Sequence, residues 1–307
     1  MAKGVIALKI LVSGSHGLVG TALIKVLSSK GHQVARLVRN VPTSDSDVQW
    51  HPEQGMIASE KMEDFEAVFH LAGESIASGQ WTEEKKRRIR ESRVIGTQLL
   101  AEAVAHLTHP PGVFVSASAI GIYGNRGDEL LTEESSAGDD FLARVCIDWE
   151  RSTAAAEEKG IRVVKPRFGI ILAEEGGALA KMLPPFRMGI GGKIGSGHQW
   201  MSWIALDDVV SGLEFVLQRE TISGPVNFAA PNPVTNATFA GTLGKSLGRP
   251  TFLPVPSFGA RLAFGEMADA LLLTSQKVEP KRLNESGFSF QYPDLKTALS
   301  HILGKRQ

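Results

Sequence analysis

An α/β fold with a doubly wound parallel sheet is the architecture that this sequence predicts. Apolar runs that suit buried strands alternate with amphipathic helical segments over the first half of the chain. A glycine-rich turn joins the first apolar run to the first helix. After about residue 175, glycine and proline become frequent, which indicates a loop-rich region followed by a small, mainly helical C-terminal lobe.

The individual elements follow from the spacing of apolar residues and from end signals. Residues 8–12 are apolar apart from Lys9, as in a strand that is buried on both faces of a parallel sheet. Helix 17–29 is closed by Gly31, and helix 82–107 is capped by Thr82 without a capping box. The repeated strand–helix–strand order predicts right-handed crossovers. The other expected elements are strands 33–38, 67–71, 113–118, 161–166 and 200–204, and helices 139–159 and 207–218.

The chain divides into two expected domains. Residues 1–248 are expected to form the sheet-bearing domain, with substrate-cleft insertions at 175–205. Residues 249–307 are expected to form a small helical domain. Prolines separate its short helices, at Pro254, Pro256, Pro280 and Pro293.

The composition favours a globular protein with small-molecule ligands. Of 307 residues, 43% are hydrophobic and 21% are charged, and 33 basic residues balance 33 acidic ones. Nucleic-acid and anionic-membrane partners need a positive surplus, which the whole chain lacks; the basic run 85–88 lies among glutamates and is interpreted as a solvated helix face. No apolar run approaches the roughly 20 residues that span a bilayer. The single cysteine, Cys146, suits a reducing cytoplasm, and a homo-oligomer or a protein partner stays open.

A glycine turn follows the first strand and opens the first helix. Its pattern is Gly14-x-x-Gly17-x-x-Gly20. The first glycine permits the tight turn, the second lets the backbone approach a pyrophosphate, and the third lets the helix pack close to the strand. The helix N-terminus offers free N–H groups to the phosphates. The sequence therefore predicts a Rossmann-type dinucleotide site, completed by Ser15, His16, Leu18 and Val19.

The residues after the second strand favour NADP(H) over NAD(H). NAD-binding sites place an acidic residue there, which bonds the ribose 2′-hydroxyl. Here the segment 36–40 carries no acid, and the first one is Asp45. Arg39 is placed to bind a 2′-phosphate, with Arg36 as a second candidate. The alternative is that one or both arginines face solvent.

Two further motifs accompany the glycine turn: Phe69-His70-Leu71-Ala72-Gly73, and the segment 116–124, which contains Ser118 and Tyr123. Together the three resemble the extended short-chain dehydrogenase/reductases of the NAD(P)-dependent epimerase/dehydratase superfamily. The resemblance implies the fold and the nucleotide, with Leu71, Ala72 and Gly73 at the cofactor, and implies the reaction much less. A closer resemblance is to an atypical branch of epimerase-family or cell-division-inhibitor proteins that ends in a domain of unknown function. It is carried by residues 138–141, 149–150, 184–186, 191–197, 203–208 and 254–303.

The resemblance implies a catalytic serine, tyrosine and lysine, of which this chain keeps the serine. Ser118 matches that serine at the end of its strand, where it would bind the substrate oxygen. The tyrosine position falls on Leu142 and the lysine position on Cys146, four residues apart on one helix face. Arg93 replaces an asparagine of the parent family. Neither Leu142 nor Cys146 can play the original part.

Tyr123 is the alternative candidate for proton transfer, because it follows Ser118 by five residues. Its hydroxyl would need a cationic neighbour, such as Arg93 or Arg167. Arg167 follows a strand, at the sheet edge where α/β proteins bind ligands, and is a candidate for the cofactor or for an anionic substrate group. The alternatives are structural: a packed tyrosine, a serine bonded to backbone, a locally paired arginine, and a Cys146 that acts as a small apolar residue.

Three residues of the glycine-rich region are candidates for the substrate cleft. His198, Trp200 and Trp203 lie where the resemblance places that cleft, and tryptophans could hold a ring or a sugar. Structural aromatics are the alternative. No metal site is expected, because the eight histidines lack ligand-like spacing.

Two functions remain open on the sequence alone. The first is an NADP(H)-dependent oxidoreductase or epimerase that acts on a small polar carbonyl or alcohol, with the cofactor carrying the hydride. The second is a nucleotide-responsive regulator without turnover, for example of cell division. In both, the partners are a dinucleotide and a small-molecule or protein ligand.

Overall fold

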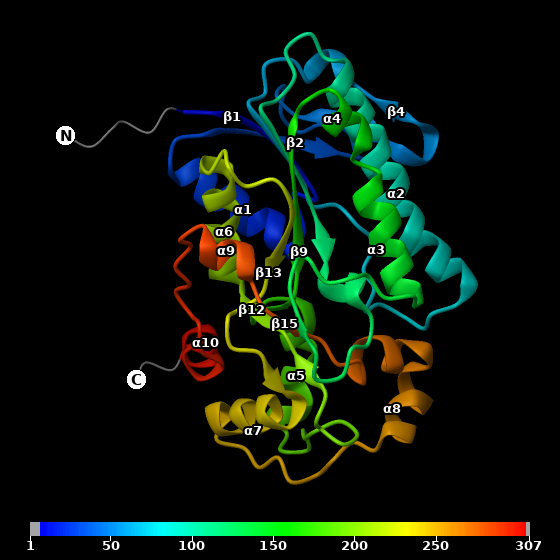
Figure 1. The fold of residues 1–307 in the computed structure, drawn as a ribbon, viewed down its shortest axis with the longest axis vertical. Coiled ribbons are helices and arrows are strands. Elements are labelled where there is room, and N and C mark those ends of the chain that lie inside the picture. Colours follow the sequence, from blue (N-terminus) through cyan, green and yellow to red (C-terminus); the bar gives the residue numbers. More distant parts are fainter. Residues whose placement is uncertain (1–6, 305–307) are drawn as a thin grey trace, which may run out of the picture.

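The computed structural model describes residues 7–304, and the main sheet of this part has nine strands. Its order is β13-β9-β6-β5-β1-β2-β3-β4, with β7 beside β9 (Figure 1). All of these neighbours pair in parallel except β3 and β4. The order reverses between β1 and β5, which creates the crevice where open α/β sheets bind nucleotides. The strands are β1 (Lys9–Ser13), β2 (Gln33–Val38), β3 (Val48–His51), β4 (Met56–Ile57), β5 (Ala67–His70), β6 (Val113–Ser116), β7 (Ser118–Ala119), β9 (Arg162–Phe168) and β13 (Gly224–Phe228).

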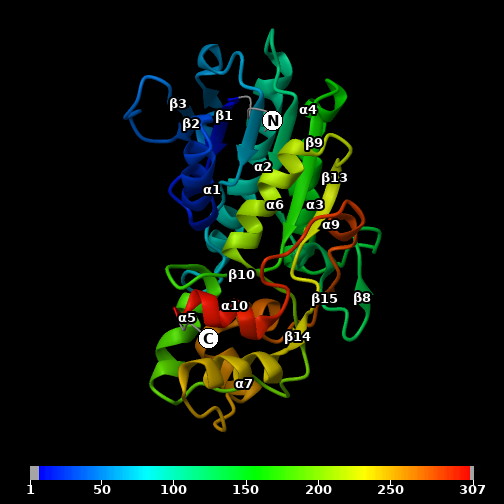
Figure 2. The same cartoon turned by 90° about the vertical axis from the view of Figure 1, so that its left-hand side faces the viewer.

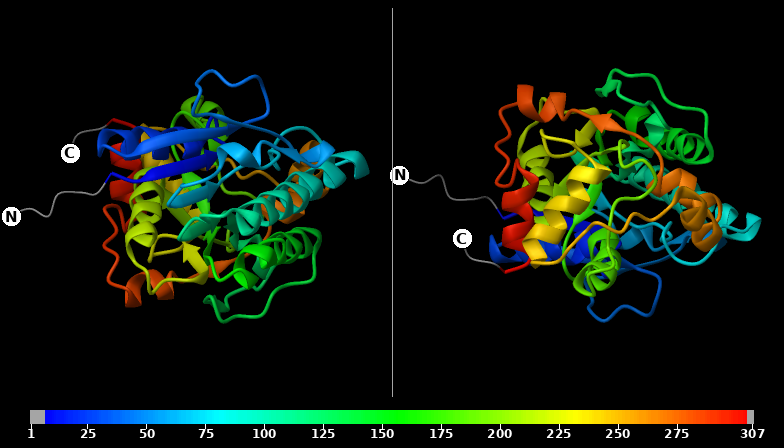
Figure 3. Two further views of the ribbon diagram at one scale, coloured as in Figure 1. Left: turned by 90° about the horizontal axis from the view of Figure 1, so that it is seen from above. Right: turned by 90° about the horizontal axis from the view of Figure 1, so that it is seen from below.

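Helices cover both faces of this sheet (Figures 1 and 3). On one face, α1 (Leu18–Ser29) and α6 (Leu206–Gln218) bury a core with Ile10, Val12 and Val226. The other face carries α2 (Glu83–His106), α3 (Phe141–Arg151) and α4 (Ala154–Glu158). The strands are apolar on both faces because both faces are covered, as the sequence predicts. Short helical turns η1 (Pro52–Gln54), η2 (Ser59–Lys61) and η3 (Ile120–Tyr123) connect these elements.

A second lobe lies beside the carboxyl ends of the parallel strands (Figure 2). Its core joins α5, α7 and α10 around the buried ring of Trp203. Its short strand pairs are β10 (Ile170–Leu172) with β12 (Trp203–Ala205) and β11 (Trp200–Met201) with β14 (Val234–Thr235). Its helices are α5 (Gly177–Arg187), α7 (Asn236–Leu247), α8 (Ser257–Phe264), η4 (Ala268–Leu272) and α10 (Leu295–Ile302), whereas α9 (Lys281–Glu285) lies against the main sheet.

The C-terminal tail is mainly helical, as expected, and it packs against three earlier segments. Helix α10 packs on α7, and α9 packs on β13 of the main sheet. Strand β15 (Lys277–Val278) pairs with β8 (Leu130–Leu131), which follows the turn η3. The buried carboxylate of Asp208 accepts the backbone N–H groups of Gln291 and Tyr292, at 2.7 and 3.0 Å. These contacts tie the tail to both lobes.

Four expected elements differ from the structure. The expected strand 200–204 is wrong as a single strand, because β11 and β12 pair with different partners, β14 and β10. The predicted helix 139–159 is wrong as a single helix, because α3 ends at Arg151 and α4 begins at Ala154. The predicted strand 113–118 is interrupted at Ala117, whose N–H bonds to the carbonyl of His70. The region after residue 175 contains the helix α5, which includes Pro184 and Pro185. Among residues 7–304, no helix combines the length and apolarity that crossing a bilayer requires.

Candidate functional site

The glycine turn between β1 and α1 is shaped by close backbone contacts. Gly14 has a φ of +67°, a left-handed conformation that favours glycine. A Cβ on Gly14 would lie 2.7 Å from the carbonyl carbon of Leu71, and a Cβ on Gly20 would lie 2.2 Å from the carbonyl oxygen of Gly14. These two glycines therefore let the turn press against the loop after β5 and let α1 begin directly above it.

The N-terminus of α1 is open to an anion. Its N-cap residue is Gly17, which makes no side-chain cap, and the first turn holds no acidic residue. A Cβ on Gly17 would meet only the carbonyl oxygen of Gly14, at 3.2 Å. Around the turn, Ser15 is buried, His16 is exposed, and Leu18 and Val19 are half-buried. The first N–H groups of α1 can thus receive a phosphate.

Below the turn, a buried histidine joins β1 to β5. The amide of Leu71 donates to Ser13 Oγ at 3.1 Å, and Ser13 Oγ lies 2.6 Å from His70 Nδ1. The second ring nitrogen, Nε2, has no hydrogen-bond partner among the described residues. Burial lowers the pKa of His70 to about 4, so the imidazole is neutral at physiological pH.

The loop after β5 is held by α2. Gly73 lies against the guanidinium of Arg93, because a Cβ on Gly73 would be 3.4 Å from Arg93 Cζ. The next residue, Glu74, donates its N–H to Ser92 Oγ at 3.0 Å and accepts from Lys85 Nζ at 2.5 Å. Leu71 and Ala72 are half-buried, and Gly73 is exposed. The structure thus brings Leu71 and Ala72 against Gly14 of the glycine turn, whereas Gly73 lies against Arg93.

The two candidate phosphate-binding arginines occupy different positions near the end of β2. Arg39 is exposed just after the strand, whereas Arg36 is half-buried within it, on the opposite face to Ala35 and Leu37. Asp47 is buried, and its carboxylate accepts the backbone N–H of Arg36 at 3.1 Å. Asp47 therefore stabilises the loop after β2, and we assign it a structural role.

At the carboxyl ends of β6 and β9, the candidate catalytic side chains bond to one another. Ser118 Oγ donates to Glu150 Oε1 at 2.7 Å, and Arg167 binds both oxygens of Glu150, at 2.8 and 2.9 Å. Arg167 also donates to the hydroxyl of Tyr123 at 3.0 Å, and that hydroxyl donates to Asn227 Oδ1 at 2.7 Å. Burial alone would lower the pKa of Arg167, but its bonds to Glu150 and Tyr123 outweigh burial and raise the pKa overall.

Tyr123, Arg167 and Ser118, which the sequence suggested as groups that contact the substrate or the cofactor, instead bond to other side chains of this network. Tyr123 is completely buried, and burial raises the pKa of its hydroxyl despite the neighbouring guanidinium. Its position does not favour the proton-relay role expected from the sequence. Arg167 is paired locally with Glu150, which does not favour the expected contact with the cofactor. Ser118, only 2% exposed, has its one proton committed to Glu150.

Arg93 and Cys146 meet beside this network. The Arg93 guanidinium lies 5.0 Å above the ring of Trp149 and donates to the carbonyl of Ile89 at 3.0 Å. Burial lowers its pKa, while the charge of Glu74 acts in the opposite direction. Cys146 is buried, and burial raises the pKa of its thiol to about 12. The thiol is therefore neutral, and Arg93 is the cation that faces the loop at Gly73.

The three expected cleft residues are separated. His198 is exposed, and Trp200 is half-buried, with its Nε1 donating to Asp128 at 2.7 Å. Lys277 Nζ lies 4.4 Å from the centre of the Trp200 ring. Trp203 is completely buried in the core of the second lobe, which does not fit a cleft wall. Among residues 7–304, no cluster of three or more histidine, cysteine or acidic side chains is arranged to hold a metal.

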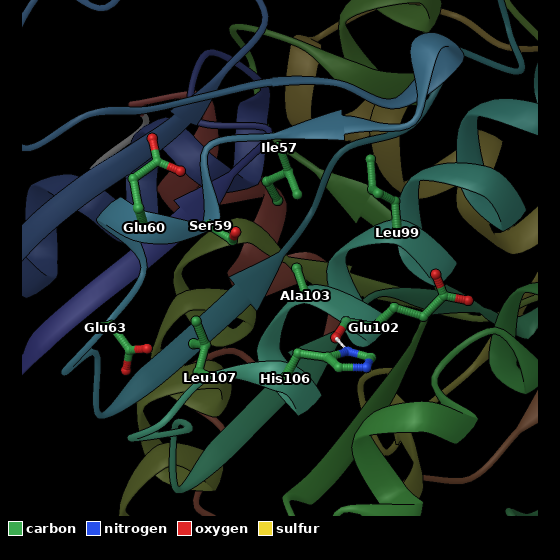
Figure 4. A pocket seen from close by; sticks show the side chains of 9 residues that line it. All are labelled: Ile57, Ser59, Glu60, Glu63, Leu99, Glu102, Ala103, His106 and Leu107. Atoms are coloured by element: carbon green, nitrogen blue, oxygen red, sulfur yellow. Dashed lines mark hydrogen bonds between the residues drawn. The ribbon is translucent and has the colours of Figure 1, made fainter.

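A separate surface pocket lies between the C-terminal half of α2 and the segment 57–63 (Figure 4). Its lining includes Glu60, Glu63 and Glu102, and His106 Nδ1 lies 2.7 Å from the carbonyl of Glu102. These segments precede β5 and β6, so the pocket lies at the amino-terminal edge of the sheet. Ligands of open α/β sheets bind at the other edge, and this pocket is therefore outside the candidate site.

The sequence reasoning missed two residues of the network and the buried histidine. Glu150 was named only within the segment 149–150 that carries the resemblance, although it lies four residues after Cys146 and eight after Leu142, on the same helix face. That spacing could have identified it. Nothing local to Asn227 signals its bond to Tyr123, since the two residues are 104 positions apart.

Comparison with known proteins gives consistent matches over the chain. Residues 10–229 match the NAD dependent epimerase/dehydratase family, and residues 255–302 match a domain of unknown function, DUF1731. The chain is 41% identical to the epimerase family protein Mb2239 of Mycobacterium bovis over 301 residues, which cover 98% of both chains.

Two solved structures extend this similarity. One is the human epimerase family protein SDR39U1 (isoform 2) with NADPH, with a TM-score of 0.89 and 33% identity over 97% of this chain and 100% of that chain. The other is a nucleoside-diphosphate sugar epimerase from Corynebacterium glutamicum, with a TM-score of 0.80 and 40% identity. That alignment covers 98% of this chain and 59% of that one.

Proposed function

The chain belongs to the NAD dependent epimerase/dehydratase family, and on that premise we propose that it is an NADP(H)-dependent oxidoreductase or epimerase. The observation that carries the proposal is the open N-terminus of α1 above a turn that only glycine can form at Gly14 and Gly20. A pyrophosphate fits these backbone N–H groups. The similar human protein whose structure contains NADPH supports the same cofactor.

The preference for NADP(H) rests on Arg39. It lies at the carboxyl end of β2, where the ribose of a dinucleotide would lie, and it is exposed with no carboxylate within ion-pair distance among the described residues. The nearest buried acid, Asp47, is engaged by the backbone of Arg36. A 2′-phosphate would give Arg39 its missing anionic partner.

The proposed substrate is a small polar carbonyl or alcohol. The cofactor supplies or accepts a hydride, and the chain orients the substrate oxygen. Arg93 would stabilise negative charge that develops on that oxygen, because it is a half-buried cation beside the cofactor loop. Ser118 would accept a hydrogen bond from a substrate hydroxyl, since its own proton goes to Glu150. We propose the cytoplasm as the compartment, because the only cysteine is Cys146.

Parallel titrations with NADPH and NADH test this proposal through the fluorescence of the reduced nicotinamide. One arginine–phosphate contact contributes about 1.5–3 kcal/mol, so NADPH should bind roughly tenfold or more tightly. Arg39→Ala should erase the difference, while Arg151→Ala, which changes an exposed arginine on α3, should not. Preferential binding would justify a carbonyl screen, in which Arg93→Ala should lower turnover. If neither nucleotide binds, the enzyme proposal fails.

A regulator without turnover is the second candidate, and one observation favours it. Large apolar side chains are exposed on the C-terminal tail: Phe252 is 76% exposed, Phe258 74% and Leu262 85%. Exposed apolar surface of this kind accompanies protein–protein contacts. On this proposal, residues 249–307 act as a domain that contacts a partner protein, and the nucleotide changes that contact. Nucleotide binding that survives without any turnover in the screen would support it.

A further inference from the structure

The basic run at the start of α2 contains one arginine that differs from its neighbours. Lys85 pairs with Glu74, Lys86 with Glu83 and Glu266, and Arg87 with Glu84 and Glu91. Arg88 is exposed and makes no ion pair or side-chain hydrogen bond within the described part of the chain. The interpretation of the run as a solvated helix face accounts for Lys85, Lys86 and Arg87, which are paired with glutamates. Arg88 has no such partner within the described chain.

The position of Arg88 on the helix directs it toward the cofactor loop. It lies three residues after Lys85 and four before Ser92, so the three share one side of α2. Lys85 Nζ binds the Glu74 carboxylate at 2.5 Å, and Ser92 Oγ accepts the Glu74 N–H at 3.0 Å. Arg88 is therefore flanked by the two residues that clasp the loop beside the glycine turn.

Arg39 follows β2 at the same edge of the sheet as this loop. The pKa of Glu74 is lowered, first by its bond to Lys85 and then by the charges of Lys85, Arg88 and Arg39. Arg39 follows the end of β2, which is separated from β5 only by β1 in the sheet, so Arg39 and the loop that carries Glu74 lie at the same carboxyl edge. Since Lys85 already neutralises Glu74, the positive charge of Arg88 and Arg39 is not balanced locally.

We propose that Arg88 is a second specificity-determining residue for NADP(H), and that it binds the 2′-phosphate of the cofactor together with Arg39. This rests on the proposed function. Three segments converge for it: the end of β2, the loop after β5 and the first turns of α2. Two guanidinium groups suit a phosphate with close to two negative charges, because each can donate a pair of hydrogen bonds.

The test compares three variants of the full chain in NADPH and NADH titrations. Arg88→Ala should weaken NADPH binding about tenfold and leave NADH binding unchanged. Arg88→Lys should keep part of the affinity, because it retains the charge and loses the paired donors. The matched control is Arg87→Ala, the next residue on the helix, whose guanidinium is engaged by Glu84 and Glu91; it should bind both nucleotides like the wild type.

The outcomes separate this inference from the function on which it rests. The wild type could prefer NADPH and lose that preference in Arg39→Ala but keep it in Arg88→Ala. The proposed role of Arg88 would then be refuted, while the assignment of NADP(H) as the cofactor would stand. If the wild type shows no preference, both proposals are overturned. If Arg88→Ala weakens both nucleotides equally, Arg88 contacts no 2′-phosphate, and the inference also fails.

Discussion

The two ends of the nucleotide-binding edge are built in opposite ways. At the carboxyl ends of β1, β2 and β5, the site consists of glycines and backbone N–H groups, with arginines at its rim that have no anionic partner in the described chain. At the ends of β6 and β9, Ser118 and Arg167 both bond to Glu150, and Arg167 also bonds to Tyr123. The first region is ready for an anion, whereas the second is satisfied internally.

This difference indicates in which region a ligand could bind without breaking existing hydrogen bonds or ion pairs of the protein. A phosphate at the glycine turn would replace only water on the N–H groups of α1. A substrate that bonded Arg167 would have to break a buried ion pair with Glu150, which is expensive in a low-dielectric environment. Arg93 could bind a ligand without breaking an ion pair. Within the described chain it makes only one hydrogen bond, to the carbonyl of Ile89.

The largest effect is expected from breaking the ion pair at the second region. Both side chains of the Glu150–Arg167 pair are largely buried, at 12% and 8% exposed. Arg167→Met should reduce the free energy of unfolding by about 3–5 kcal/mol, because it leaves Glu150 charged and unpaired. Urea denaturation followed by circular dichroism measures the change.

The control for that prediction removes both charges. The double variant Arg167→Met with Glu150→Gln should recover most of the lost stability, because no uncompensated charge remains. Equal loss in the single and double variants would show that the pair is not what holds this region together. NADPH affinity should change little in either variant if the two regions are as separate as the structure indicates.

The next effect is the pH dependence of stability that arises from His70, which lies below the glycine turn. The pKa of His70 is about 4 in the folded protein and about 6.5 in an unfolded chain. Between these values the unfolded state binds more protons, so stability is complete above about pH 6.5 and is lost as the pH falls toward 4. At 1.36 kcal/mol per unit, the loss is about 3 kcal/mol.

His70→Gln isolates this contribution from those of other titrating groups. The variant should show a flatter decline in stability between pH 6.5 and 4 than the wild type. The exposed His106 provides the control, and His106→Gln should keep the wild-type decline. An unchanged decline in His70→Gln would mean that burial does not hold the histidine neutral in the folded protein.

The comparison of the two regions also explains how far the sequence could predict them. The glycine turn could be predicted because its requirements are local: a positive φ at Gly14 and no room for a side chain at Gly20. The parallel sheet and α2 could be predicted from apolar runs and from the Thr82 cap, whose side chain accepts the N–H of Lys85. Such features depend on residues that are close together in the chain.

The second region depends on long-range partners that no local pattern reveals. Ser118 and Glu150 are 32 residues apart, and the tail places Arg282 N 3.2 Å from Glu133, across 149 residues. The break between α3 and α4 at residues 152–153 has a local cause instead, since the side chains of Ser152 and Thr153 bond back to the carbonyls of Asp148 and Glu150. Side chains that compete with the helix in this way give only a weak signal in the sequence.

The smallest of the three effects is expected from adding one methyl group to the first region. Gly20→Ala would place a Cβ 2.2 Å from the carbonyl oxygen of Gly14. Since backbone must move to relieve the contact, we expect a loss of about 1–3 kcal/mol of stability together with weaker NADPH binding. Gly241→Ala, within α7 and with nothing within 4 Å of the added Cβ, should instead gain about 0.5–1 kcal/mol. If Gly20→Ala bound NADPH as tightly as Gly241→Ala does, the close approach of α1 to the turn would not be what shapes the phosphate site.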